Sequence, residues 1–429
     1  MPGKILLSLL LSTLLAAAPV AADTRAFVGA TIIDGTAIDE GGSTMTEDAV
    51  VLVRDGRIIA VGSRSEVEIP GDAERIDLTG RYLIPGLINA HAHVGDVRGL
   101  ESGHYSEDNV LRQLGLYARY GITTAVSLGG DEEEAFVIRD AQDRADLDHA
   151  RIFVAGPVLN PGSPEAARIA VDRVADMNPD YIKIRVDDFL GRGQKMAPEV
   201  YEAIAVRSME HDIPLAVHIF YLEDARALLE LNADLIAHSI RDQHVDQALI
   251  DQMLARDVCF NPTLTRELST FVYAEEPDFF SDPFFRREVD DAVIETLLEP
   301  ERQRAMQQSP MAEGFRAALP IARANLKLLS DAGVGVAMGT DSGVAGRFQG
   351  YFEHLEMEMM AEAGLTPAEI LYSATGGAAR CMGLEDLGTL EAGHWADMVI
   401  LRENPLDDIR NTQSIEQVRI AGNRVPDSD

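Results

Sequence analysis

The chain has few cysteines: only Cys259 and Cys381 occur among its 429 residues. This excludes a disulfide-rich scaffold, and neither cysteine belongs to a spacing typical of a thiolate metal site. Each lies in an apolar stretch, as buried free thiols often do. A disulfide between them stays open, but the sequence favours two independent buried thiols.

Basic residues are also scarce, with 37 Lys and Arg against 71 Asp and Glu, for a net charge of −34. Nucleic-acid binding depends on neutralising phosphates, so this balance argues against nucleic acid as a partner. It argues equally against anionic membrane surfaces. The simplest interpretation is a strongly hydrated, soluble surface.

Long apolar runs are absent except at the N-terminus, where Lys4 precedes an apolar stretch from Ile5 to Ala18. That stretch is too short to span a bilayer. Small residues at Val20 and Ala22 fit cleavage before Asp23, so residues 1–22 are predicted to be a signal peptide. We expect a periplasmic or secreted protein with no membrane insertion after cleavage.

The two ends of the mature chain share one pattern of short strands with Gly-containing turns. Examples are 27–33, 49–53 and 57–61 near the start, and 396–401 and 417–422 near the end. We expect residues 23–83 and 385–429 to form one composite β-sandwich domain.

Residues 84–384 alternate between strands and amphipathic helices, which predicts a (β/α)8 barrel of the TIM type. The fold class is therefore α/β. Helices are expected between the strands, with 352–363 and 367–381 after the last one. The expected strands are Leu87–His91, Thr123–Leu128, Arg151–Ala155, Tyr181–Val186, Pro214–Ile219, Asp234–Ser239, Val258–Pro262 and Val334–Gly339.

Residues 265–313 break this alternation and form an insertion that is long for a loop between a strand and a helix. The insertion is rich in aromatic residues and charges. Two interpretations remain equally open: a lid or substrate wall over the barrel mouth, or a helical insertion that packs on the barrel or forms a dimer contact.

Residues suited to metal binding occur near the carboxyl ends of five expected strands. His91 and His93 point to the same side because alternate residues of a strand share a face. Each residue has a structural explanation of its own: a satisfied core histidine, a surface lysine or a helix cap. Five coincidences at one end of a barrel are harder to explain than one site. The downstream candidates are Lys183, His218, His238 and Asp341.

This pattern resembles the amidohydrolase superfamily, and more narrowly its imidazolonepropionase-like group of metal-dependent Xaa-Pro and Xaa-Arg dipeptidases. The resemblance covers nearly the whole mature chain. It is carried by the site residues together with 84–88, 339–341, 388–393 and 396–397.

The resemblance implies two divalent metal ions, with zinc suiting the N/O ligands. His91, His93 and Asp341 would hold one ion and His218 and His238 the other. Lys183 would bridge them once carboxylated by CO2, because a free ammonium has no lone pair.

The implied chemistry is hydrolysis by a metal-activated hydroxide, with one ion polarising the scissile carbonyl. Asp341 would move the proton to the leaving amine, and His238 is counted with it as a catalytic residue. The sequence nominates Tyr221, Arg185 and Arg241 for substrate binding. The two arginines would bind a substrate carboxylate through paired hydrogen bonds. Salt bridges to nearby acidic residues are the competing interpretation for the arginines.

Two departures from the dipeptidase-like pattern stand out. Small or Gly-rich residues usually follow the bridging lysine, whereas here residues 185–188 read Arg-Val-Asp-Asp. A tyrosine usually follows the fifth-strand histidine closely, and Tyr221 is shifted by one residue. Its alternative role is that of a packing aromatic.

We expect an exported amidohydrolase that cleaves a small-molecule amide, either a dipeptide or an N-acyl amino acid. A cyclic amide or lactone hydrolase is the alternative at the same site. A mononuclear heterocycle deaminase fits less well, because that type lacks the lysine and has a Glu shortly after the fifth-strand histidine. A barrel that has lost its metals is a third alternative. The sequence leaves the substrate, the metal and homo-oligomer formation open.

Overall fold

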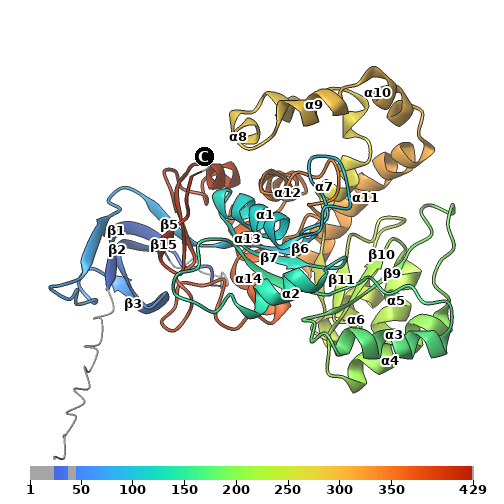
Figure 1. The fold of residues 1–429 in the computed structure, drawn as a ribbon, viewed down its shortest axis with the longest axis horizontal. Helices are drawn as coiled ribbons and strands as arrows, with labels where there is room; N and C mark the ends of the chain where they lie inside the picture. The colour runs from blue at the N-terminus through green and yellow to red at the C-terminus, as the bar shows by residue number, and fades with distance from the viewer. Residues whose placement is uncertain (1–23, 37–44, 428–429) are drawn as a thin grey trace, which may run out of the picture.

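The structure is a computed structural model that describes residues 24–36 and 45–427. The predicted signal peptide, residues 1–22, lies outside the described residues. Figure 1 shows a sheet of short strands at one end of the molecule and a body of parallel strands and helices beside it. Within the described residues, no helix combines the length and the hydrophobicity needed to cross a membrane.

Strands from both chain ends form one eight-stranded sheet with the order β15-β14-β13-β5-β1-β2-β3, in which β4 also pairs with β1. The two ends join where β5 and β13 pair antiparallel, with Leu83 opposite Ile400. In β2, Val51 and Val53 pack into one apolar cluster and Val50 and Leu52 into another, as the two-residue period of a strand dictates. The strands are β1 (Arg25–Ile33), β2 (Met45–Arg54), β3 (Arg57–Ser63), β4 (Glu74–Asp77), β5 (Tyr82–Pro85), β13 (Met398–Leu401), β14 (Ile415–Ile420) and β15 (Asn423–Arg424).

Seven further strands form two parallel sheets, with the orders β6-β7-β8 and β9-β10-β11-β12. They are fully or nearly fully buried, as expected for parallel strands covered by helices. An isolated parallel bridge, Leu159 to Ile184, joins the two sheets. These strands are β6 (Leu87–Ala92), β7 (Ile122–Ser127), β8 (Arg151–Val154), β9 (Ile182–Val186), β10 (Leu215–Ile219), β11 (Leu235–Ala237) and β12 (Cys259–Asn261).

The eighth strand predicted over Val334–Gly339 is absent from these sheets. The segment around it makes only isolated bridges, Phe260 to Val336 and Ala92 to Ser342. Glycines at 335 and 339 explain the difference, because a Cβ at Gly339 would lie 2.3 Å from Asn261 Nδ2. Glycine at such close approaches weakens regular strand structure. The segment still connects β12 to β6, in the order expected for a closed barrel.

Helices follow the parallel strands in sequence. The helix predicted over 367–381 is divided into α13 and α14, because Thr375 between them has non-helical backbone angles, with φ −136° and ψ −109°. The helices outside the insertion are α1 (Glu107–Arg119), α2 (Glu133–Asp140), α3 (Pro164–Ala175), α4 (Pro198–Glu210), α5 (Leu222–Glu230), α6 (Gln247–Ala255), α11 (Pro310–Asp331), α12 (Tyr351–Glu362), α13 (Pro367–Ser373), α14 (Gly376–Met382) and η3 (Ile409–Gln413).

The insertion is helical, and in Figure 1 α9 and α10 stand out from the parallel sheets. Its aromatic residues pack on the start of α12 and on the segment just before it: the ring of Phe285 lies 5.0 Å from that of Tyr351 in α12 and 4.9 Å from that of Phe348. Phe280 and Phe285 are buried. The aromatic residues therefore fix the insertion to the body of the protein. Its elements are α7 (Leu264–Ser269), η1 (Val272–Ala274), η2 (Asp278–Ser281), α8 (Pro283–Arg286), α9 (Asp291–Leu297) and α10 (Pro300–Gln307).

The two cysteines are bonded to each other, with their Cα atoms 5.7 Å apart. The favoured interpretation of two independent thiols is therefore wrong. Cys259 begins β12 and Cys381 lies in α14, 122 residues later, so only the tertiary fold brings them together.

Replacing Cys381 with serine is expected to lower the free energy of unfolding by roughly 2–4 kcal/mol, because the disulfide closes a long loop in the unfolded chain. Denaturant titration of the wild type and the variant, each with and without a reducing agent, would measure the change. Reductant should destabilise only the wild type. An equal effect of reductant on both proteins would contradict the prediction.

Candidate metal centre

The end of β6 supplies two histidines whose proton positions are set by their neighbours. The buried His91 has Nδ1 3.1 Å from Asn261 Oδ1. Asn261 uses its amide nitrogen to donate to the Ala337 carbonyl, so its oxygen faces His91. Nδ1 of His91 must then be the donor, which leaves a lone pair on Nε2.

His93 has the same arrangement. Its Nδ1 donates to the carbonyl oxygen of Gly129 at 2.7 Å, so Nε2 is the nitrogen left to bind a cation or a second proton. That Nε2 lies 2.7 Å from Asp341 Oδ1, and His91 Nε2 lies 3.4 Å from the same oxygen. Three electron-pair donors therefore converge on one point.

This convergence fits a divalent cation. The ligand atoms of His91, His93 and Asp341 all lie within 4.8 Å of one another. Lone pairs that face one another repel unless a cation or a proton lies between them, and two imidazoles with a carboxylate form a usual ligand set for zinc and related ions. The residues present thus fit the metal that the sequence predicts.

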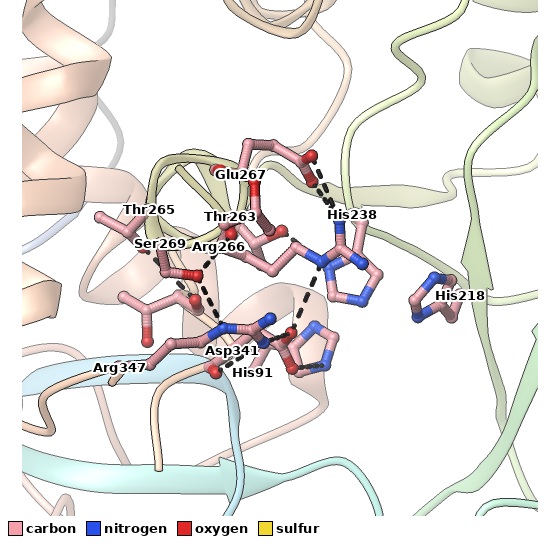
Figure 2. Close-up of polar contacts among 12 residues, drawn as sticks. His91, His218, His238, Thr263, Thr265, Arg266, Glu267, Ser269, Asp341 and Arg347 are labelled. Atoms are coloured by element: carbon pink, nitrogen blue, oxygen red, sulfur yellow. Dashed lines mark hydrogen bonds and ion pairs between the residues drawn. The ribbon is translucent and has the colours of Figure 1, made fainter. Parts of the chain in front are cut away.

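Two arginines that the sequence analysis missed hold Asp341 (Figure 2). Arg347 Nη1 donates to Asp341 Oδ2, and Arg266 Nε lies 3.9 Å from the same oxygen. Burial alone would raise the pKa of Asp341, but Arg347 and the imidazoles of His238 and His93 outweigh it and hold that pKa well below its ordinary value. Asp341 is therefore an ionised carboxylate with one oxygen neutralised by arginine and the other turned to the histidines.

The backbone at Asp341 is fixed by a buried carboxylate on α12. Oε1 of Glu353 accepts hydrogen bonds from Asn89, Thr340 and Ser342, at 2.6, 2.7 and 2.6 Å respectively. Two of these donors flank Asp341, whose φ of +59° is unusual for a residue with a side chain. Glu353 therefore holds the strained residue from both sides.

Lys183 lies beside this group, with its Nζ 3.1 Å from His91 Nε2. Burial lowers the pKa of Lys183 to about 7, although Asp341 acts to raise it. Much of the side chain is then a neutral amine near neutral pH. A neutral amine is the form that can react with CO2.

His238 and His218 extend the row of imidazoles. The ring of His238 lies 4.6 Å from that of His91 and 4.2 Å from that of His218, and Figure 2 shows it between His218 and the Asp341 group. His238 Nδ1 is 2.7 Å from Thr263 Oγ1. Burial lowers the pKa of His218 to about 3, so its ring is neutral and suited to bind a metal. Their role as ligands of a second ion remains a prediction.

Arg241 lies next to the site but inside the protein. Its side chain has no exposed surface, its Nε is 2.9 Å from Glu267 Oε1, and its Nη1 donates to the carbonyl oxygens of Ile219 and Ser239. Those carbonyls follow His218 and His238 directly. The arrangement argues against the predicted contact with substrate and favours a clamp between the ends of β10 and β11.

Tyr221 and Arg185 are more accessible. The hydroxyl of Tyr221 donates to Asp188 Oδ1 at 2.7 Å, so a substrate would have to share it. Arg185 is half-buried and follows Lys183 by two residues, which places both on the same face of β9. Its guanidinium lies 4.8 Å from the centre of the Phe189 ring, and within residues 24–36 and 45–427 it has no ion pair.

Sequence reasoning found the histidines, the lysine and Asp341 because their types and spacing indicate metal chemistry. It missed Asn261, Arg266, Glu267 and Arg347, which hold them in place. Arg266 and Glu267 open the insertion, and Arg347 follows Asp341 by six residues. Their nearness to strand ends was the only indication available in the sequence.

The comparisons with known proteins agree with this geometry. The model of the Amidohydrolase family matches residues 82–425. An imidazolonepropionase from Mycolicibacterium smegmatis is 26% identical over 392 residues, which cover 87% of this chain and 89% of that protein. An imidazolonepropionase from Streptomyces coelicolor is 25% identical over 381 residues, which cover 83% of this chain and 86% of that protein.

Solved structures share the fold along nearly the whole chain. A candidate prolidase from Bifidobacterium longum has a TM-score of 0.76 at 26% identity, covering 94% of this chain and 95% of its own. A Xaa-Pro dipeptidase with bound methionine in its active site has a TM-score of 0.74 at 20% identity, covering 94% and 99%. The chain therefore belongs to the amidohydrolase family and is a metal-dependent hydrolase that acts on carbon–nitrogen bonds.

Proposed function

We propose that the protein is an exported amidohydrolase that cleaves the amide bond of a dipeptide or an N-acyl amino acid. The observation that carries the proposal is the convergence of His91 Nε2 and His93 Nε2 on Asp341 Oδ1, with Lys183 Nζ beside them. The proposal includes the closed (β/α)8 barrel and the composite β-sandwich. The bridges that join the parallel sheets and the pairing of β5 with β13 support these two features.

In this proposal, His91, His93 and Asp341 would hold one divalent ion, His218 and His238 would hold a second, and Lys183, once carboxylated, would bridge them. Zinc fits the ligand set. When bound, such ions acidify water to a pKa of roughly 7 and polarise a carbonyl. Asp341 would take the proton of the attacking water and deliver it to the leaving amine.

A carboxylate on the substrate is the group that Arg185 would recognise. Arg185 is the nominated arginine with no ion pair in the described part of the chain, and it lies on the same face of β9 as Lys183. Arginine binds carboxylates through two parallel hydrogen bonds. This favours an N-acyl amino acid or a dipeptide over an uncharged amide.

Export is proposed from the N-terminal apolar segment, and the disulfide supports it. Disulfides persist in oxidising compartments and are rare in the cytosol. Small molecules released outside the cytoplasm would then be its substrates.

A panel of dipeptides, N-acyl amino acids, cyclic amides and lactones would test the proposal, using metal-loaded enzyme prepared with bicarbonate. Release of an amine supports the amidase. Lactone opening without amine release would favour the alternative lactonase, and ammonia release would favour a deaminase. Removal of the metal by a chelator should abolish turnover, and added zinc should restore it.

Asp341→Asn is expected to lower kcat by roughly 10²- to 10⁴-fold, because an amide cannot shuttle the proton. Turnover of the best substrate, together with the metal content of the same sample, would measure this. Near-normal turnover at full metal content would show that Asp341 does not transfer the proton.

Lys183 is expected to carry one CO2 in the metal-loaded enzyme. Native mass spectrometry of enzyme prepared with bicarbonate should show an added mass equal to one CO2, which Lys183→Arg should lack because its guanidinium stays protonated. The same added mass in both proteins, or no added mass in either, would contradict the prediction.

Arg185→Gln is expected to raise KM for a carboxylate-bearing substrate by about 10- to 100-fold, since a charge-assisted hydrogen bond is lost. Its effect on the matching substrate without the carboxylate should be small. Arg192→Gln, an exposed arginine in the following loop, serves as the matched control. Equal effects of Arg185→Gln on both substrates would argue against a carboxylate contact.

A further inference from the structure

Directly after β9, a buried aspartate contacts one of the candidate metal ligands. Asp187 Oδ2 lies 3.1 Å from His218 Nε2, and the Asp187 side chain has no exposed surface. Its other oxygen, Oδ1, accepts a hydrogen bond from the backbone nitrogen of Phe189 at 2.9 Å. Both carboxylate oxygens are therefore in use, one for the loop and one for the histidine.

The contact determines which nitrogen of His218 carries the proton. Asp187 Oδ1 already accepts from the backbone of Phe189, and Oδ2 faces His218 Nε2, so the carboxylate is placed as an acceptor toward both groups. An ionised carboxylate only accepts hydrogen bonds. A hydrogen bond across this contact needs the proton on His218 Nε2, and in a ring with a single proton the lone pair is then on Nδ1.

The loop alone does not require a carboxylate at this position. The turn at Phe189 uses only Oδ1, and Asn or Ser forms such turns without a charge. Burying a charge in the protein interior is costly unless the charge is paired. A second, charged oxygen aimed at an imidazole instead matches the way proteins orient metal-binding histidines from behind.

We propose that Asp187 is a positioning residue that holds His218 with Nδ1 unprotonated and directed to the second metal ion. The inference rests on the proposed function only in assuming that His218 is a metal ligand. It also explains why the chain departs from the small residues expected after Lys183: the side chain at position 187 reaches the imidazole of the next strand.

The isosteric change Asp187→Asn gives the sharpest test. An asparagine offers one acceptor where Phe189 and His218 present two N–H donors. If the asparagine oxygen keeps accepting from Phe189, the amide nitrogen donates to His218 Nε2. The ring proton is then on Nδ1, so Nδ1 has no lone pair for a metal. Asp187→Ala removes both contacts.

The experiment starts from the Co²⁺-loaded full-length enzyme and removes the ions with increasing chelator, following visible absorption and bound cobalt. His238→Asn, which removes a proposed ligand of the second ion, identifies the release step that belongs to that ion. Asp188→Asn is the matched control, because Asp188 lies in the same loop and contacts no histidine in the described residues. Unfolding temperatures of all the metal-free proteins report on the loop.

Both Asp187 variants are expected to weaken binding of the second ion by about 10- to 100-fold, while the first ion and the Asp188→Asn protein stay close to wild type. For Asp187→Asn the unfolding temperature should change little. Unchanged binding of the second ion would overturn the inference. Equally weakened binding of both ions, together with a lower unfolding temperature, would also overturn the inference, because Asp187 would then only stabilise the loop.

The outcomes also separate this inference from the proposed function. A wild-type enzyme that binds a single ion overturns the inference, since His218 would have no metal to bind. An enzyme that binds two ions and hydrolyses no amide in the panel refutes the proposed activity. In that case the release of cobalt alone still decides the role of Asp187.

Discussion

The candidate centre depends on one electrostatic constraint: two imidazole lone pairs and a carboxylate oxygen point at each other. Asn261 and Gly129 accept the protons of His91 and His93 on the far side of each ring, so the short contacts of both Nε2 atoms with Asp341 need either a cation or an added proton between them. Such an arrangement is unfavourable without a positive charge between the groups. A divalent ion supplies that charge, so the hydrogen bonds behind the histidines are as much a part of the centre as the ligands themselves.

A second constraint is the burial of several charges around that centre. Glu267 lies between Arg241 and Arg266, and all three side chains are buried. Such networks add little net stability, but removing one member leaves an unpaired charge inside the protein. Arg266 and Glu267 lie at the start of the insertion, in α7, so their ion pairs fix this helix to the site. Glu356 on α12 accepts from the backbone nitrogens of Leu264 and Thr265 at the same helix and fixes it from the other side.

The insertion illustrates the limit of pattern reasoning. Its aromatic residues suggested either a lid or a packed element, and composition alone could not distinguish them. The structure packs them against α12, and the same segment contributes Arg266 beside Asp341.

By itself, the sequence determined the alternation of strands and helices, the pairing of both chain ends in one sheet and the identity of the candidate ligands. These follow from local periodicity and from residue types whose chemistry is specific. The tertiary structure decided what depends on distant contacts: the Cys259–Cys381 bond, the missing eighth strand at Gly335 and Gly339, and the arginines on Asp341. It also placed Arg241 in the interior and Asp187 against His218, since side-chain hydrogen bonds between strands are set by where the chain folds back, which no local pattern encodes.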